Sequence, residues 1–148
     1  MKNQTNLKND KKIKATASIK RDTIPEEITK NILDGLRIFE REKKFLSKGI
    51  SLKQLAMDLK TNTSYLSFTI NSYVEKNFSK YISDLRIQYS IDKLKEDKKF
   101  RLYSIKAIAS EVGFKSQEAF SKAFYKKTGI YPSYFINNLN NSEKTLSG

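Results

Sequence analysis

Hydrophobic residues recur every three or four positions along most of the chain, and this spacing predicts α-helices. The first such segment follows TIPEE, in which a threonine hydroxyl, a proline and two acidic residues are typical of a helix start. We therefore predict a helix from about Pro25 to Phe45, closed by the segment Ser47-Lys48-Gly49. The residues expected on its buried face are Ile28, Ile32, Leu36 and Phe39.

The same spacing predicts six further helices. They cover SLKQLAMDL, NTSYLSFTINSYV, a long stretch from about Ser79 to Lys95, two short stretches between residues 104 and 128, and PSYFINNL. No segment alternates like a strand, so the sequence predicts an all-α fold. The residues expected to face inward are Leu52, Leu55, Ala56 and Leu59 in the second helix, Leu66, Ile70 and Tyr73 in the third, Ile82, Leu85, Tyr89 and Leu94 in the long one, and Phe120 and Phe124 further on.

A shift of about 53 residues lays the chain over itself. SLK at residues 51–53 falls on SIK at 104–106, and one extra residue in the second turn then raises the offset to 54. Beyond that point FSKYISDL falls on PSYFINNL, an agreement that a shared helical period does not explain. We infer two copies of one supersecondary unit.

Each copy contains two short helices joined by a tight turn, which predicts a helix-turn-helix. In the second copy Gly113 permits the positive φ of a sharp corner, and Ala109 lets the second helix cross closely. In the first copy Lys60 stands at the position of the glycine, so its turn is expected to be either strained or differently shaped. The helix that connects the two copies has roughly 17 residues and spans about 25 Å. This length is suited to placing two DNA-reading helices about one turn of DNA (~34 Å) apart.

The second helix of each copy has a polar face opposite its apolar face. Hydroxyl, amide, ammonium and carboxylate groups in such a place can approach base edges in the major groove, although an ordinary solvated face has the same pattern. Phe68 is the exception in this face, since its ring either packs on the N-terminal helix or contacts a thymine methyl. The candidate base-contacting residues are Ser64, Ser67, Phe68 and Asn71 in the first copy and Gln117, Glu118, Ser121 and Lys122 in the second.

The starts of these two helices carry groups that hold phosphates. Thr63 and Ser116 are also expected to be N-caps, a role that is compatible with a phosphate contact. The candidate phosphate-contacting residues are Asn62 and Thr63 in the first copy, and Lys115, Ser116, Tyr125 and Lys126 in the second.

Composition narrows the function. Lys and Arg number 29 against 16 Asp and Glu, and the net charge of +13 attracts polyanions. The sequence has no His and no Cys, which removes the usual general base and thiol nucleophile, and its acids are not paired. We therefore expect no enzyme activity, no cofactor and no metal, and double-stranded DNA as the partner. The alternative is a basic helical module on an anionic membrane surface or on a protein partner.

The two ends of the chain differ from its middle. Residues 1–22 are rich in Lys and have no apolar period, which predicts a disordered basic tail, either a solvated linker or a segment that touches phosphates. No membrane span or signal peptide is expected, so the predicted location is the cytoplasm, in association with the nucleoid. After the tail we expect an N-terminal helix (23–46), a double helix-turn-helix domain (47–140, with a first unit 47–78, a connector 79–97 and a second unit 98–140), and a flexible C-terminal tail (141–148).

The stretch IASEVGFKSQEAFSKAFYKKTGIYPSYF, residues 108–135, resembles the motif IAxxVGFxSQxxFSxxFxKxTGxxPSxF of AraC/XylS-type bacterial transcription regulators. The resemblance extends from Ser51 to about Leu139 and is looser in the first copy. It implies a sequence-specific DNA-binding domain, activating or repressing, whose two recognition helices enter successive major grooves, with the transcription machinery as a further candidate partner. The base contacts that it implies are Ser64, Ser67, Phe68, Gln117, Glu118, Ser121 and Lys122.

Two positions depart from the pattern of this family. Phe68 stands where a basic residue is frequent, which leaves base reading by the first copy open. Val74-Glu75 stands where Thr-Gly is a common helix end, which leaves the exit of that helix open. The helix from Pro25 to Phe45 is expected outside the shared domain, and it resembles the segment before this domain in regulators that carry large sensors. The sensor itself is expected to be absent or separate.

Overall fold

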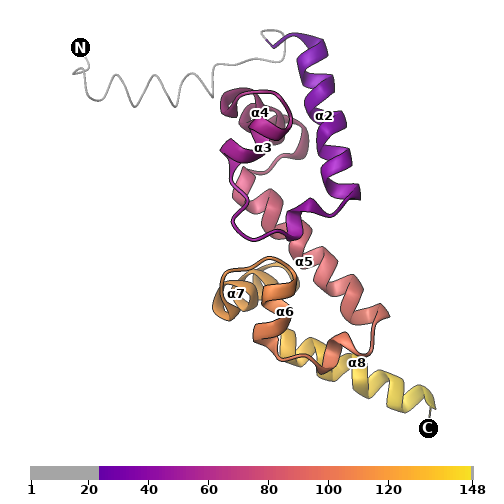
Figure 1. Ribbon diagram of the computed structural model, residues 1–148. Coiled ribbons are helices and arrows are strands. Elements are labelled where there is room, and N and C mark those ends of the chain that lie inside the picture. Colours follow the sequence, from indigo (N-terminus) through magenta and orange to yellow (C-terminus); the bar gives the residue numbers. More distant parts are fainter. Residues whose placement is uncertain (1–23, 148) are drawn as a thin grey trace, which may run out of the picture. The chain divides into compact units, whose positions relative to one another are not determined.

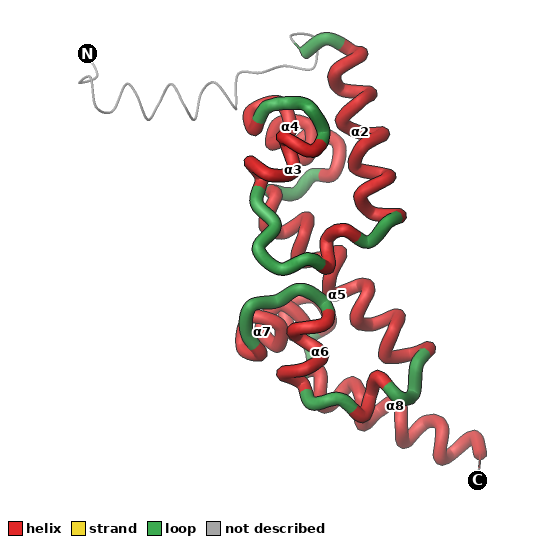
Figure 2. Tube along the Cα trace, in the orientation of Figure 1, coloured by secondary structure: helices red, strands yellow, loops and turns green. Residues whose placement is uncertain are grey.

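The computed structural model describes residues 24–147, and all regular elements in this part of the chain are helical, as predicted (Figure 1, Figure 2). The segment 1–22, expected to be a basic tail, lies outside the described residues. The elements in chain order are α2 (Glu26–Arg41), the 3-10 turn η1 (Lys44–Leu46), α3 (Leu52–Asp58), α4 (Thr63–Thr69), the π-helical turn η2 (Ile70–Val74), α5 (Phe78–Glu96), the 3-10 turn η3 (Phe100–Leu102), α6 (Ile105–Glu111), α7 (Gln117–Thr128) and α8 (Pro132–Ser147).

The chain folds into two compact units, and the boundary between them crosses α5 after Tyr81. The first unit contains α2, α3, α4, η2 and the first turn of α5. The second contains the rest of α5, the helices α6 to α8, and also residues 43–49, which precede α3 in the chain. A segment that lies before the first helix-turn-helix in the sequence is therefore part of the second unit.

Helix α2 packs against α4 in the first unit. Its buried residues are three of the four that the sequence predicted, Ile32, Leu36 and Phe39. The helix ends at Arg41, earlier than predicted, because Lys43 takes a left-handed φ of 56° and turns the chain into η1. Its N-cap is Pro25, which forms no side-chain cap bond, and the expected Thr23 hydroxyl lies outside the described residues.

The core of the first unit also includes Leu55, Ala56, Leu66 and Ile70, as expected. Tyr73 was predicted to join this face, but its side chain is 44% exposed. The reason is that the helix widens into the π-helical turn η2 after Thr69, which rotates the following residues away from the buried face.

Four phenylalanine rings run through the core of the second unit. Phe114, Phe120, Phe124 and Phe135 contact one another in sequence, with ring centroids 5.4–5.8 Å apart in edge-on or tilted geometry. Such aromatic pairs add about 0.5–1.5 kcal/mol each beyond area burial. Since Phe120 and Phe124 are the inward residues of α7, this cluster fixes which face of α7 remains outside.

Helix α5 buries residues that its apolar period did not single out. Ile82 and Leu94 are buried as predicted, whereas Leu85 and Tyr89 are only partly buried. Ile87 and Ser90 are fully buried and were missed. The first turn of α5 belongs to one unit and the remainder to the other, so its buried positions do not follow one stripe.

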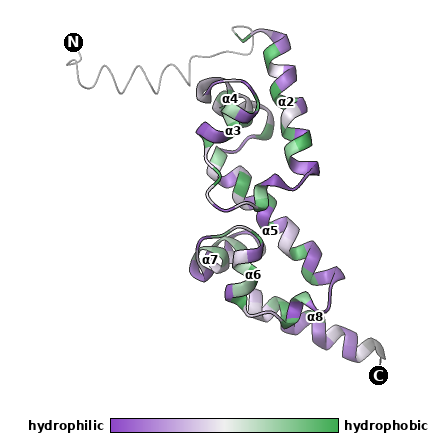
Figure 3. Ribbon diagram, in the orientation of Figure 1, coloured by the Kyte–Doolittle hydropathy of each residue, from purple (hydrophilic) through white to green (hydrophobic). Residues whose placement is uncertain are grey.

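Helix α8 continues to Ser147, through residues that were expected to form a flexible tail. Arg101 contacts this extension. Its buried guanidinium donates to the carbonyl oxygens of Leu94 (2.6 Å) and Lys95 (3.0 Å) at the end of α5, and to the Glu143 carboxylate on α8 (2.9 Å). The hydrogen bond from Arg101 lowers the pKa of Glu143, because it stabilises the charged carboxylate. The last turns of α8 are otherwise hydrophilic (Figure 3).

Candidate nucleic-acid interface

The two copies predicted from the sequence have the same backbone turn. In the first, the amide of Thr61 donates to the carbonyl oxygen of Ala56, and in the second the amide of Phe114 donates to that of Ala109, both at 2.9 Å. Helices α3 and α6 begin 53 residues apart, and α4 and α7 begin 54 apart, as the shift in offset predicted. The helix-turn-helix is thus present twice.

The corner residue is left-handed in both copies. Gly113 has a φ of 95° and Lys60 a φ of 57°. The sequence left the turn at Lys60 either strained or differently shaped. The structure shows the strained turn, since a lysine at positive φ costs roughly 1–2 kcal/mol. A different turn shape is excluded by the matching hydrogen bonds.

Short polar side chains cap α4 and α7, which are the second helices of the two copies and are here called the recognition helices. Ser116 accepts the Ala119 amide at 3.1 Å, which confirms the cap predicted for α7. In the first copy Asn62 accepts the Tyr65 amide at 2.8 Å, so the cap is Asn62, and the prediction of Thr63 was wrong by one residue. Thr63 is instead the first residue of α4, since the offset between the copies is 54 at this point.

On α7 the candidate residues Glu118, Ser121, Lys122, Tyr125 and Lys126 lie away from Phe120 and Phe124, and Gln117 is the first residue of the helix. Only Ser121 among them is partly buried, and the others are exposed. Tyr125 stacks on Tyr131, with centroids 4.7 Å apart, a neighbour that the sequence pattern did not indicate. The exposed candidates of the second copy are Lys115, Ser116, Gln117, Glu118, Lys122, Tyr125 and Lys126.

The first copy presents a more closed and less charged face. Ser64, Ser67 and Phe68 are partly buried, and Ser67 accepts a long hydrogen bond of 3.5 Å from the Asn71 amide. The exposed candidates here are Asn62, Thr63 and Asn71. Phe68 of α4 and Lys122 of α7 are at equivalent positions of the two copies. The second copy therefore has a lysine side chain where the first has an aromatic ring.

The two recognition helices also end differently. Thr128 donates its hydroxyl to the carbonyl oxygen of Phe124 at 2.8 Å, and Gly129 closes α7 at a φ of 82°. In the first copy the helix leaves through η2 and closes at Glu75, whose φ is 60°. The exit that the Val74-Glu75 pair left open is therefore a π-helical turn ended by a strained residue.

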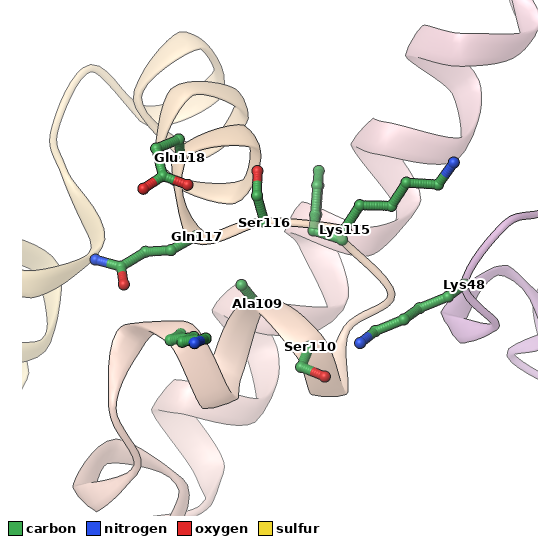
Figure 4. Close-up of a pocket in the computed structure, with 9 residues that line it drawn as sticks. Lys48, Ala109, Ser110, Lys115, Ser116, Gln117 and Glu118 are labelled. Carbon is green, nitrogen blue, oxygen red and sulfur yellow. The ribbon is translucent and has the colours of Figure 1, made fainter.

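A cavity of about 470 Å³ lies beside the start of α7 (Figure 4). Lys115, Ser116, Gln117 and Glu118 line it, together with the α6 residues Lys106, Ala109 and Ser110, with Phe114, and with Lys48. Lys48 and Lys106 were not among the predicted site residues. The repeat offered a signal for Lys106, because it matches Lys53 of the first copy, whereas nothing in the local sequence indicated Lys48.

Within residues 24–147 no group of carboxylates is arranged to hold a metal ion. None of the helices in that range has both the length and the apolar character needed to cross a membrane.

Comparison with known proteins settles the family. A family model described as a helix-turn-helix domain, of the AraC type, matches residues 55–138. The chain belongs to this family.

Two curated proteins are similar to part of this chain. The Raffinose operon transcriptional regulatory protein RafR of Pediococcus pentosaceus is 29% identical over 89 residues, which are 60% of this chain and 31% of RafR. The Uncharacterized transcriptional regulatory protein YesN of Bacillus subtilis (strain 168) is 35% identical over 88 residues, 58% of this chain and 23% of YesN. The chain thus matches a third or less of the length of these relatives.

Two solved structures share the fold of this chain. The C-terminal domain of AraT, a response regulator from Geobacillus stearothermophilus, has a TM-score of 0.62 at 22% identity and covers 73% of this chain and 84% of its own. An AraC-type transcriptional regulator from Chromobacterium violaceum has a TM-score of 0.62 at 19% identity, with 74% and 91% coverage.

Proposed function

We propose that this chain binds double-stranded DNA sequence-specifically and regulates transcription, with α7 in one major groove and α4 in a neighbouring one. The observation that carries the proposal is the face of α7, where Gln117, Glu118 and Lys122 are exposed while Phe120 and Phe124 are locked into the core. An amide, a carboxylate and an ammonium group on a rigid helix are the chemistry that reads base edges. Membership of an AraC-type DNA-binding family supports the same reading.

The two copies contribute unequally in this proposal. Lys122 donates to guanine, Glu118 accepts from cytosine N4, and Gln117 and Ser121 contact neighbouring bases. Ser64, Ser67, Phe68 and Asn71 of the first copy form a shallower contact without charge. The residues proposed to hold phosphates are Asn62, Thr63, Lys115, Ser116, Tyr125 and Lys126.

The proposed function also implies a location, a partner and a source of the regulatory signal. A regulator of this kind acts on the nucleoid and meets the transcription machinery there, and its signal comes from a sensor outside the residues that the structure describes. A basic module on an anionic membrane surface remains the competing function, because net positive charge favours both polyanions.

Selection of bound sequences from a random duplex pool, followed by mobility shifts at several salt concentrations, tests the proposal. If about six to eight phosphates are neutralised, the slope of log affinity against log salt is expected to be roughly −5 to −7. Lys122→Ala should weaken binding to the selected site by about 1–3 kcal/mol and relax the sequence preference in one half of it. Lys30→Ala, on the exposed surface of α2, is the charge-matched control.

Anionic liposomes at the same salt provide the comparison with a membrane surface. Co-sedimentation with liposomes, together with no selected duplex bound at 50 mM salt, would overturn the assignment.

A further inference from the structure

Residues 43–49, here called the strap, are anchored on the second unit. Phe45 is buried and meets the Tyr89 ring edge-on, with centroids 6.2 Å apart. The Arg86 guanidinium donates from Nε to the Phe45 carbonyl oxygen (2.6 Å) and from Nη2 to that of Ser47 (2.7 Å). Two backbone carbonyl groups of the strap are thus held by one partly buried side chain of α5.

The corner of the second helix-turn-helix is shaped to receive the strap. A Cβ atom added to Gly113 would lie 2.7 Å from the carbonyl oxygen of Leu46, and 2.8 Å from Nε of Arg86. The Arg86 guanidinium also lies over the ring of Phe114, 5.7 Å from its centroid. Any residue other than glycine at this corner would push the strap away.

The anchored strap delivers Lys48 to the cavity beside α7. Figure 4 shows Lys48 extending toward Ser110 from a separate segment, while Lys115 and Ser116 project from the loop before α7. Lys106 of α6 lines the same cavity. Three lysines from three segments therefore line a space with one carboxylate residue, Glu118, and Figure 4 shows that the Lys115 side chain extends away from Lys48. None of the three lysines forms an ion pair with a carboxylate of residues 24–147.

We propose that this cavity holds one phosphate of the DNA backbone at the edge of the groove that α7 enters, and that Lys48 is a phosphate ligand which the strap contributes. The inference rests on the proposed function and deepens it. Lysine is a compact cation suited to phosphate oxygens, and two serine hydroxyls, of Ser110 and Ser116, line the same space as further donors. Lysines without a carboxylate partner, such as Lys48 and Lys106, gain from a phosphodiester bound beside them.

A free phosphate ion has the same chemistry as a backbone phosphate, so the experiment needs separate arms. The first compares the wild-type chain with Lys48→Ala, Lys48→Arg and the control Lys30→Ala in mobility shifts across a salt series. Lys48→Ala should lower affinity roughly three- to tenfold for all duplexes alike and make the salt slope shallower by about 1. Lys48→Arg should keep most of the wild-type affinity and salt slope, and Lys30→Ala should change neither the affinity nor the slope.

The second arm locates the phosphate. Single neutral methylphosphonates are scanned along the selected duplex, and one or two positions next to the half-site of α7 should weaken the wild-type chain but not Lys48→Ala. The third arm titrates inorganic phosphate and follows amide NMR shifts at the cavity. Because Lys48 is exposed, unfolding of all variants should be unchanged.

The outcomes separate the two levels of proposal. If the wild-type chain binds no duplex, the function itself is wrong. If it binds DNA but Lys48→Ala behaves like Lys30→Ala, the Lys48 assignment is wrong. Saturable binding of inorganic phosphate at the cavity combined with unchanged DNA binding by Lys48→Ala would assign a free-anion site instead, which also overturns it.

Discussion

Lys60 and Gly113 occupy the same corner of two helix-turn-helix units whose backbones match, yet the two positions tolerate side chains very differently. Lys60 is exposed and bears a side chain at a positive φ of 57°. Gly113 is buried under the strap, where a carbonyl oxygen stands 2.7 Å from the place of a Cβ. A glycine at a turn is thus required by its neighbour in one copy, while in the other copy the turn forms without it at the cost of strain.

In each unit a segment that precedes α3 packs over the corner of the helix-turn-helix, and a glycine allows the close contact. This covering segment is α2 in the first unit and the strap in the second. In the first unit the glycine is on the cover: a Cβ on Gly35 of α2 would lie 2.5 Å from a methyl carbon of Leu59. In the second unit the glycine is on the helix-turn-helix and the cover is the strap. In both units, therefore, a segment that precedes α3 in the sequence packs closely against the corner of the helix-turn-helix.

The largest effect is expected from Gly113→Ala. The left-handed φ costs about 1–2 kcal/mol in an L-residue, and the contact with the strap adds an overpacking cost of about 1–3 kcal/mol. Urea unfolding should therefore show a loss of roughly 2–5 kcal/mol. Gly129→Ala is the matched control, because its φ is 82° but a Cβ there meets nothing within 4 Å. Equal losses in the two variants would contradict the role of the strap.

A smaller effect, of about 2 kcal/mol, is expected from Phe68→Ala. The ring is partly buried, so its removal should cost less than the ~3–5 kcal/mol of a fully buried phenylalanine. Lys122→Ala, at the equivalent position of α7, should leave urea unfolding unchanged and weaken DNA binding instead. If Phe68→Ala leaves unfolding unchanged while affinity for A·T pairs in one half-site falls, the ring contacts a thymine methyl and not the protein interior.

The sequence was sufficient for those features that depend on local chemistry. The repeat, the corner at Gly113, the cap at Ser116 and the inward pair Phe120 and Phe124 follow from spacing and residue type, and the structure agrees with each. The outward face of α7 is the complement of that inward pair. Its contacts with DNA remain a prediction.

The sequence was insufficient where residues distant in the chain decide the outcome. The strap depends on Arg86, which lies 39–41 residues from the carbonyl groups that it holds. A continuous helical period concealed the break after Arg41, since nothing local forces Lys43 to a positive φ. The contact between Arg101 and Glu143 of α8 likewise joins residues that lie 42 positions apart.

Thr69→Val is expected to raise stability by about 1 kcal/mol. The Thr69 side chain is fully buried and its hydroxyl has no hydrogen-bond partner among the described residues, whereas Ala123 stands at the equivalent position of α7. A buried hydroxyl without a partner costs about 1–3 kcal/mol, which an isosteric methyl group avoids. Thr69→Ser retains the hydroxyl and loses a methyl, so it should lower stability. A loss in both variants would mean that the hydroxyl is satisfied after all.

The smallest effect, of the opposite sign to Gly113→Ala, is expected from Lys60→Gly. Glycine relieves the roughly 1–2 kcal/mol cost of a left-handed lysine, but its greater freedom in the unfolded chain returns about 0.5–1 kcal/mol of that gain. The net rise in the free energy of unfolding should be about 0.5 kcal/mol, measured by urea unfolding. Lys60→Ala removes the same charge and keeps the strain, so it should show no such rise. If Lys60→Gly were instead destabilising, the side chain of Lys60 would be making a contact that outweighs its strain, and the first corner would depend on its residue as closely as the second depends on Gly113.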